Sequence, residues 1–208
     1  MDPPPTPRKS DRGKRKTRDT IKQILLLLII QREGPIGRYR LKSLLEMPLH
    51  EGIVRHMLEE YQVQNIITSS RRGAALTPHG HDYIQQLLRQ YRILDIQKFT
   101  ISLMSTNAIT LGVHLQDCAD QILSAMEVRD TAIRGGATGA TVVTYRNGVL
   151  TIPAVDPTFI TNNPKLTHQL HTTFCLKPND VVILISAESD WRGLEAVIYV
   201  ADSLMTHE

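Results

Sequence analysis

Residues 34–80 read GPIGRYRLKSLLEMPLHEGIVRHMLEEYQVQNIITSSRRGAALTPHG, and this stretch decides the fold of the N-terminal half of the chain. Leucines within residues 41–45 form an apolar stripe at helical spacing, and Pro48 interrupts the pattern. A second helix is predicted from about His50 to Gln62. Its buried side is predicted from four apolar residues at positions i, i+3, i+4 and i+7, which are Val54, Met57, Leu58 and Tyr61.

A two-stranded hairpin is predicted directly after the second helix. Residues 66–68 favour a strand because they are β-branched. Arg71-Arg72-Gly73 provides the turn, and residues 75–76 form the second strand. Thr77 is placed to cap a further helix with Pro78 at its first position, and that helix is predicted to run to Leu94. Two helices followed by a hairpin are the order of elements in a winged helix.

The predicted second helix carries polar residues on the side opposite its apolar stripe. Such a face can enter a DNA major groove, because Arg and His can donate to guanine acceptors and Glu can accept from cytosine. We predict base contacts from its N-terminal part, namely Gly52, Arg55 and His56. The alternative is an ordinary solvated face, which Glu59 and Glu60 favour at the C-terminal end.

Two further groups of basic residues are predicted to contact DNA. Arg38, Arg40 and Lys42 flank the start of the first short helix, where phosphate contacts fix orientation without reading sequence. Arg71 and Arg72 lie at the predicted hairpin tip and suit a phosphate or the minor groove. Two arginines beside a glycine also suit a turn that binds nothing.

The charge of the chain is distributed unevenly. The net charge is +5 over residues 1–18, +3 over residues 19–98 and −5 over residues 99–208, which gives +3 in total. A basic N-terminal half suits a polyanion, because each phosphate contact releases counterions. An acidic C-terminal half would be repelled by the same polyanion, so we expect it to sense a ligand or to assemble.

The composition predicts a cytoplasmic protein without a membrane span. The longest apolar run, Ile24 to Ile30, has seven residues, whereas a span needs roughly 18. We expect no signal peptide, because the Pro-rich, basic N-terminus lacks an apolar core close behind its charges. Two cysteines, Cys118 and Cys175, are too few for a disulfide framework and fit a reducing compartment.

Residues 1–18 are predicted to be a disordered basic tail, because Pro, Lys and Arg dominate them. Such a tail either adds non-specific affinity for DNA or serves only to keep the protein soluble. A first helix from Thr20 to Arg32 should form the spine of a winged-helix domain over residues 19–95. A second domain, residues 96–208, would follow.

The second domain is predicted to contain strands and helices in the order β-α-β-β-α-β-α. Asn147-Gly148 marks a hairpin between its second and third strands. The fold class is therefore α+β, a winged helix followed by a small α/β sandwich, for which a ferredoxin-like order is one compatible arrangement. The predicted elements are residues 108–114, 118–134, 141–145, 149–152, a short helix from Pro164, 181–186 and 190–205.

One helix of the second domain suggests an anion site. Arg129 falls in a predicted apolar stripe of Ile122, Met126 and Ile133, and a buried guanidinium must be paired. An internal ion pair, for example with Asp130, is one interpretation. In the other, the helix end and the following glycine-rich turn bind a phosphate or carboxylate. The predicted ligand residues are Arg129, Asp130, Arg134, Gly136, Thr138 and Gly139.

Metal binding and catalysis receive little support from the sequence. His168, His171 and Cys175 share helical spacing, but no fourth ligand is evident, and capping or packing explains them better. No activated nucleophile or zinc-protease motif occurs. We therefore expect neither a cofactor nor an enzyme.

Several short motifs resemble an archaeal family of uncharacterised two-domain proteins. Residues 37–41, 51–55 and 76–80 resemble its winged-helix half. Glu127-Val128-Arg129-Asp130 and Gly136-Ala137-Thr138-Gly139-Ala140-Thr141 resemble the markers of its second domain, an α/β domain of unknown function. The resemblance covers most of the chain beyond Ile21 and implies a DNA-binding regulator.

We therefore expect a transcriptional regulator that binds double-stranded DNA, with a C-terminal domain that dimerises or binds a small anionic effector. A homodimer would match a two-fold operator. The alternative is an enzyme or small-molecule binder whose winged helix contacts proteins. RNA binding is a third option, although the basic half has few aromatic residues for stacking.

Overall fold

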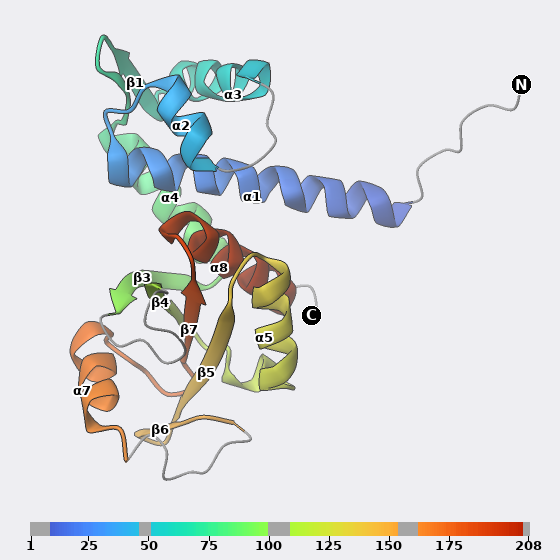
Figure 1. The fold of residues 1–208 in the computed structure, drawn as a ribbon, viewed down its shortest axis with the longest axis vertical. Helices are drawn as coiled ribbons and strands as arrows, with labels where there is room; N and C mark the ends of the chain where they lie inside the picture. The colour runs from blue at the N-terminus through green and yellow to red at the C-terminus, as the bar shows by residue number, and fades with distance from the viewer. Residues whose placement is uncertain (1–8, 46–50, 100–108, 154–161, 206–208) are drawn as a thin grey trace, which may run out of the picture. The chain divides into compact units, whose positions relative to one another are not determined.

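The computed structural model describes residues 9–45, 51–99, 109–153 and 162–205 (Figure 1). The chain divides into two compact units, residues 1–84 and residues 85–208. The predicted boundary after residue 95 therefore lies further along the chain than the observed division. Pro48 and His50 fall outside the described residues, so their predicted roles as breaker and helix start are not addressed.

The N-terminal unit is built from helices and one hairpin. Helix α1 begins eleven residues before the predicted Thr20, which corrects the expectation of a disordered tail for residues 9–18. Lys and Arg are good helix formers, and extending a helix costs less than starting one, so the basic segment continues the apolar helix. The elements of this unit are α1 (Lys9–Glu33), α2 (Arg38–Leu45), α3 (Glu51–Val63), β1 (Ile67–Ser70), β2 (Gly73–Leu76) and the start of α4 (Pro78–Gln90).

The core of this unit follows the predicted periodicity. Every residue from Ile24 to Ile30 is buried. Helix α2 buries Leu41 and Leu45, and α3 buries Val54, Met57 and Tyr61, as expected from their spacing. The fourth residue predicted on the buried side of α3, Leu58, is only half-buried. Because α1 contacts both α2 and β2, and α3 contacts α2 and β1, one apolar centre fixes the orientation of all these elements.

The hairpin is attached to the segment that follows α1. Ile36 and Ala74 exchange two backbone hydrogen bonds, each with an N···O distance of 2.9 Å. Gly73 has φ +120°, and a Cβ there would lie 2.2 Å from the carbonyl carbon of Ile36. Only glycine fits at that position. At the other end of the hairpin, the hydroxyl of Thr77 accepts from the Gly80 amide at 2.9 Å and caps α4 as predicted.

A five-stranded antiparallel sheet in the order β3-β4-β7-β5-β6 is the centre of the C-terminal unit. The ferredoxin-like order is thereby corrected, because the last strand, β7, lies between β4 and β5 instead of at an edge. The elements are β3 (Ile93–Phe99), β4 (Ile109–Leu115), a short 3-10 turn (Ala119–Gln121), α5 (Ala125–Arg134), β5 (Gly139–Arg146), β6 (Val149–Thr151), α7 (Pro164–Thr173), β7 (Val181–Ala187) and α8 (Asp190–Met205).

Strand β3 was not predicted. Helix α4 ends at Gln90, and Arg92 takes φ 56°, so the predicted helix to Leu94 is wrong in its last turn. A left-handed residue stops the helix, and Ile93 then pairs with Leu115 of β4. Sheet pairing of the following residues outweighs the helical spacing of the apolar side chains before them.

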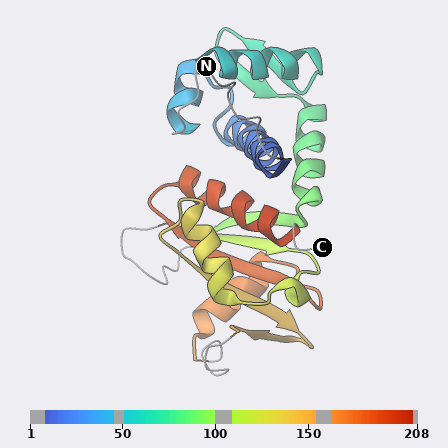
Figure 2. The same ribbon diagram turned by 90° about the vertical axis from the view of Figure 1, so that its right-hand side faces the viewer.

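Helices cover both faces of the sheet. In Figure 2 the red α8 and the yellow-green α5 lie on one side and the orange α7 on the other. Gly135 lets α5 approach α8 closely, since a Cβ there would lie 2.8 Å from the Ala196 Cα. The α7 side holds a cluster of buried apolar residues, which are Phe99, Val143, Leu150, Ile152, Leu166, Leu170, Phe174, Val182 and Leu184.

The remaining predictions for this unit differ from the structure mainly at one helix. Asn147 and Gly148 take φ 50° and 80°, which confirms the predicted tight hairpin. Helix α5 begins at Ala125 instead of Cys118, because the Ser124 hydroxyl accepts from the Glu127 amide at 3.3 Å and caps it there. Among the described residues, no helix is long and apolar enough to cross a membrane.

Candidate functional site

The outer side of α3 is exposed over its whole length. Gly52, Arg55 and His56 are all exposed, while Val54 and Met57 on the opposite side of the helix are buried. A Cβ built on Gly52 meets nothing within 4 Å, so the first turn of α3 leaves room for another molecule to approach its backbone. The predicted face therefore exists as an accessible surface.

Ion pairs run along this face. The Arg55 Nε donates to the Glu59 carboxylate at 2.7 Å, and His56 Nε2 lies 3.4 Å from Glu60. The hydrogen bond from Arg55 lowers the pKa of Glu59, and the carboxylate in turn raises the pKa of Arg55. Both partners are fully exposed to solvent, so the pair can be exchanged for another anion such as a phosphate.

Helix α2 presents a second set of basic side chains. Arg40 pairs with Glu33 at 3.0 Å, Arg38 lies 3.9 Å from Glu51, and Lys42 is exposed. Tyr39 lies between the two arginines and is 75% exposed, and sequence reasoning did not single it out. Its sequence context, one aromatic residue between two arginines, does not distinguish an exposed ring from a buried one.

The hairpin tip carries Arg71 and Arg72 in the predicted turn. The Arg72 amide donates to the Ser70 hydroxyl at 3.1 Å, and that hydroxyl donates to the Gly73 carbonyl at 3.2 Å. Both arginines are exposed, and within the described ranges neither takes part in an ion pair. Their charges are therefore available to an anion.

The predicted apolar stripe of α5 is wrong in its phase. Met126 is 67% and Ile133 is 41% exposed, and Arg129 is exposed with them, so its guanidinium is not buried. Val128 and Ala132 form the buried side instead. Small residues let α5 pack tightly, and this requirement outweighs the hydrophobicity of the larger side chains.

The glycine-rich turn after α5 uses its polar groups internally. The amides of Gly136 and Ala137 donate to carbonyls of α5, and the Thr138 amide donates to the Ser186 carbonyl at 2.8 Å. The Thr138 hydroxyl donates to the same carbonyl at 3.0 Å. These groups connect α5 to the sheet, and Gly139 begins β5 directly after them. The turn therefore joins α5 to β5 through its own backbone hydrogen bonds.

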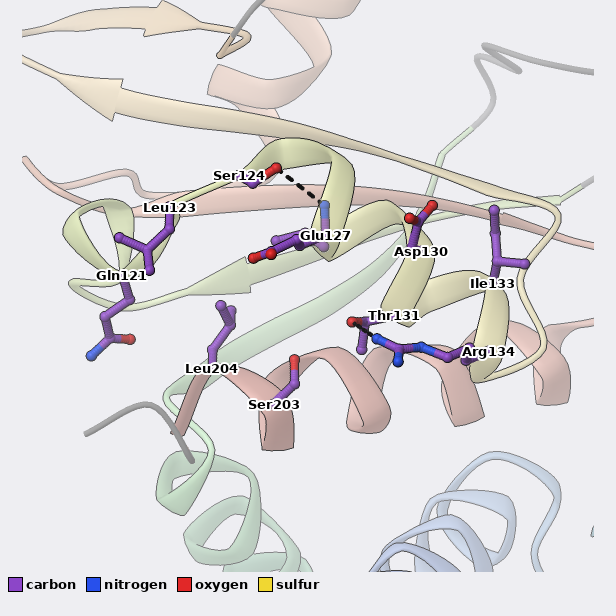
Figure 3. Close-up of a pocket in the computed structure, with 11 residues that line it drawn as sticks. Gln121, Leu123, Ser124, Glu127, Asp130, Thr131, Ile133, Arg134, Ser203 and Leu204 are labelled. Carbon is purple, nitrogen blue, oxygen red and sulfur yellow. Dashed lines mark hydrogen bonds between the residues drawn. The ribbon is translucent and has the colours of Figure 1, made fainter.

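A pocket of about 560 Å³ lies between α5 and the end of α8 (Figure 3). Two of the predicted ligand residues, Asp130 and Arg134, line it, whereas Arg129, Gly136, Thr138 and Gly139 do not. Arg134 donates to the Thr131 hydroxyl at 2.8 Å. The other lining residues are Gln121, Leu123, Ser124, Glu127, Val128, Ile133, Ser203 and Leu204.

A buried polar pair lies on the other face of the sheet. His114 Nε2 and Asp180 Oδ2 are 2.7 Å apart, with side chains 4% and 1% exposed. Asp180 also accepts from the amides of Asp117 at 3.0 Å and Lys177 at 2.8 Å. Sequence reasoning missed this pair, because its members are far apart in the chain and belong to no motif. The pair joins β4 to the loop before β7.

The two cysteines differ in exposure. Cys175 is exposed, while burial raises the pKa of the Cys118 thiol to about 11. Among the described residues, no three His, Cys, Asp or Glu side chains are grouped so as to hold a metal ion. The His171 ring instead packs edge-on against Tyr145, with centroids 6.0 Å apart.

Comparison with known proteins finds a domain family for part of the chain and a similar solved structure. Residues 106–204 match a family described as a domain of unknown function (DUF4443). A solved structure of a hypothetical protein from Pyrococcus horikoshii OT3 is 24% identical, with a TM-score of 0.65, over 90% of this chain and 94% of that one. No curated protein matches the chain. These findings support the expected resemblance to an uncharacterised archaeal family, with residues 106–204 as its domain of unknown function.

Proposed function

We propose that the chain is a DNA-binding transcriptional regulator. Its N-terminal unit would act as a winged helix-turn-helix, with α3 in the major groove and the β1–β2 hairpin on a phosphate or in the minor groove. Its C-terminal unit would dimerise or bind a small anionic effector. The observation that carries this proposal is the accessible outer face of α3, with Arg55 and His56 on a helix fixed by its buried opposite side.

The order of the elements supports this assignment. A short helix, α2, leads to α3, and an antiparallel hairpin follows with Ile67 paired to Leu76. The strand-like bridge of Ile36 to Ala74 holds the hairpin against the segment before α2. Rigid attachment of both α3 and the hairpin is what a protein needs to contact two neighbouring parts of one duplex.

Charge supports the same assignment. Arg71 and Arg72 offer two charges at the hairpin tip, and Arg38, Arg40 and Lys42 offer three more on α2. Contacts to phosphate fix the register of a protein on DNA, while α3 would read the bases. The basic residues 9–18 extend α1 and add positive charge to the same unit.

In the proposed mechanism, two copies bind the two half-sites of an operator. An effector bound to the C-terminal unit would favour one spacing or orientation of the two α3 helices over another, and so change the affinity for DNA. Coupling of this kind requires the effector to bind one of the two states more tightly.

One observation favours the alternative in which the winged helix contacts a protein. Glu59 pairs with Arg55 and Glu60 lies beside His56, so the C-terminal part of the α3 face carries acidic and basic side chains side by side. Such a face also suits a protein surface with mixed charges. The two functions differ in their response to salt, because only DNA binding releases many counterions.

The experiment that tests the proposal is selection of genomic fragments by the purified full chain, followed by gel shifts of the recovered fragments at rising salt. We expect a retained set of related sequences whose affinity falls steeply with salt concentration. Arg71→Ala should weaken binding to all fragments alike, and Arg146→Ala, an exposed arginine of the C-terminal unit, is the matched control. Failure to retain any duplex would favour the protein-contact alternative.

A further inference from the structure

Three large apolar side chains are exposed on or next to α5. Leu123 is 83%, Met126 is 67% and Ile133 is 41% exposed. Met126 and Ile133 are seven residues apart and so lie on one side of the helix, and Leu123 borders the pocket between α5 and α8 with Ile133 (Figure 3). Exposed apolar side chains on one side of a helix are available for contact with a partner.

The charges beside these side chains are arranged so that the surface complements itself. Glu127 lies in the first turn of α5 and Arg134 is its last residue, and both line the same pocket. The bond from Arg134 to the Thr131 hydroxyl holds its guanidinium on that side of the helix. A second α5 running in the opposite direction would place its Arg134 near this Glu127, and its Ile133 near this Met126.

We propose that this α5 surface, defined by Leu123, Met126, Glu127, Ile133 and Arg134, is where a second copy of the chain binds. The two copies are related by a two-fold axis that crosses the middle of α5, and the helices pack antiparallel. In such an interface the same patch is used twice, so Glu127 faces Arg134 and Met126 faces Ile133 of the other copy, while Asp130 lies near the axis. The dipoles of the two helices also oppose each other favourably.

A second copy fits this surface better than a basic peptide does. A surface that recognised a cationic segment would be acidic throughout, whereas α5 carries Arg129 and Arg134 beside Glu127 and Asp130. Both signs within ten residues suit a partner with the same two signs in reverse order. The match of Met126 to Ile133 sets the register of that pairing.

Only the role of this dimer, which is to hold two α3 helices at a fixed spacing, rests on the proposed function. The dimer itself is measured without DNA, so the two ideas can fail separately. If the chain is a monomer but still binds related duplexes, the proposed interface is wrong and the regulator proposal stands. If the chain dimerises through α5 but binds no duplex, the regulator proposal is wrong and the interface stands.

The first test is sedimentation equilibrium of the full chain. We expect the parent to reach twice its chain mass of 23.4 kDa, and Met126→Asp with Ile133→Asp to weaken dimerisation about tenfold or more. Val149→Asp is the matched control, because Val149 is 57% exposed on β6, away from α5. A monomeric parent, or a dimer equally strong in the α5 variant, would overturn the proposal.

Charge reversal and cross-linking test the antiparallel register. Glu127→Arg alone should weaken the dimer, and adding Arg134→Glu to the same chain should restore it. In a Cys175→Ser background, Met126→Cys with Ile133→Cys should form disulfides only between copies, because residues seven apart on one helix are about 10 Å apart. Absence of both rescue and cross-linking in a dimeric protein would overturn this arrangement.

Discussion

His114→Ala should destabilise the C-terminal unit more than any other substitution of a histidine within the described residues. The change removes the 2.7 Å hydrogen bond to Asp180, whose carboxylate is 1% exposed, and leaves space beside the Phe174 ring, 5.4 Å away between centroids. Leaving a buried carboxylate without one of its hydrogen bonds costs about 1–3 kcal/mol, and the space left by the ring adds to that cost. Asp180 keeps two backbone donors, from Asp117 and Lys177, so we expect about 3 kcal/mol.

Urea unfolding followed by Trp191 fluorescence measures this effect, since the only tryptophan of the chain lies in α8 of the C-terminal unit. With a slope of about 2 kcal/mol per molar urea, the midpoint should fall by about 1.5 M. His168→Ala, on the exposed side of α7, should shift it by less than about 0.3 M. Equal midpoints for the two variants would refute the reasoning that the buried pair stabilises this unit.

Three further predictions concern the outer face of α3, the hairpin and the cysteines. Glu59→Gln should release Arg55 and tighten binding of a selected duplex by about threefold to tenfold at low salt, measured by fluorescence anisotropy; weaker binding would contradict this. Gly73→Ala should lower the free energy of unfolding by more than about 1 kcal/mol and speed hydrogen exchange in the hairpin, because alanine is strained at a φ of +120°. Unchanged exchange would argue against backbone strain at this position. Cys175 should react with a thiol reagent in the folded chain and Cys118 only after unfolding. Since burial raises the pKa of Cys118 to about 11, the unfolded thiol ionises first, and the free energy of unfolding should fall as pH rises above about 8.5; an increase there would contradict this sign.

Local signals predicted much of the fold. Periodicity located α2 and α3, Thr77 and Pro78 located the start of α4, and Asn147-Gly148 located the β5–β6 hairpin. These features depend on neighbours in the chain. Each is therefore readable from a short stretch of sequence.

Features that depend on distant residues were not predicted. Strand β3 exists because β4 pairs with it, and the strand order follows from where β7 inserts. The phase of α5 depends on how closely α8 approaches it at Gly135. These contacts cannot be predicted from residue spacing along one helix. Arg129 was therefore predicted to be buried, whereas it is exposed.

In the candidate site, the sequence predicted which side chains are exposed better than it predicted which residues they contact. The outer face of α3 was predicted from periodicity, and Gly52, Arg55 and His56 are exposed as expected. The Arg55–Glu59 pair could be anticipated from its i, i+4 spacing. The exposure of Tyr39 could not, because a single ring beside two arginines fits a core position equally well.

The most direct test of the central claim compares the sequence preference of the parent with that of Arg55→Ala. Both proteins would be titrated against a selected duplex and against the same duplex with its bases shuffled, at one salt concentration. We expect the parent to prefer the selected duplex and Arg55→Ala to lose about 1–3 kcal/mol of this preference, while it still binds both duplexes. An unchanged preference in Arg55→Ala would contradict the claim that α3 reads DNA.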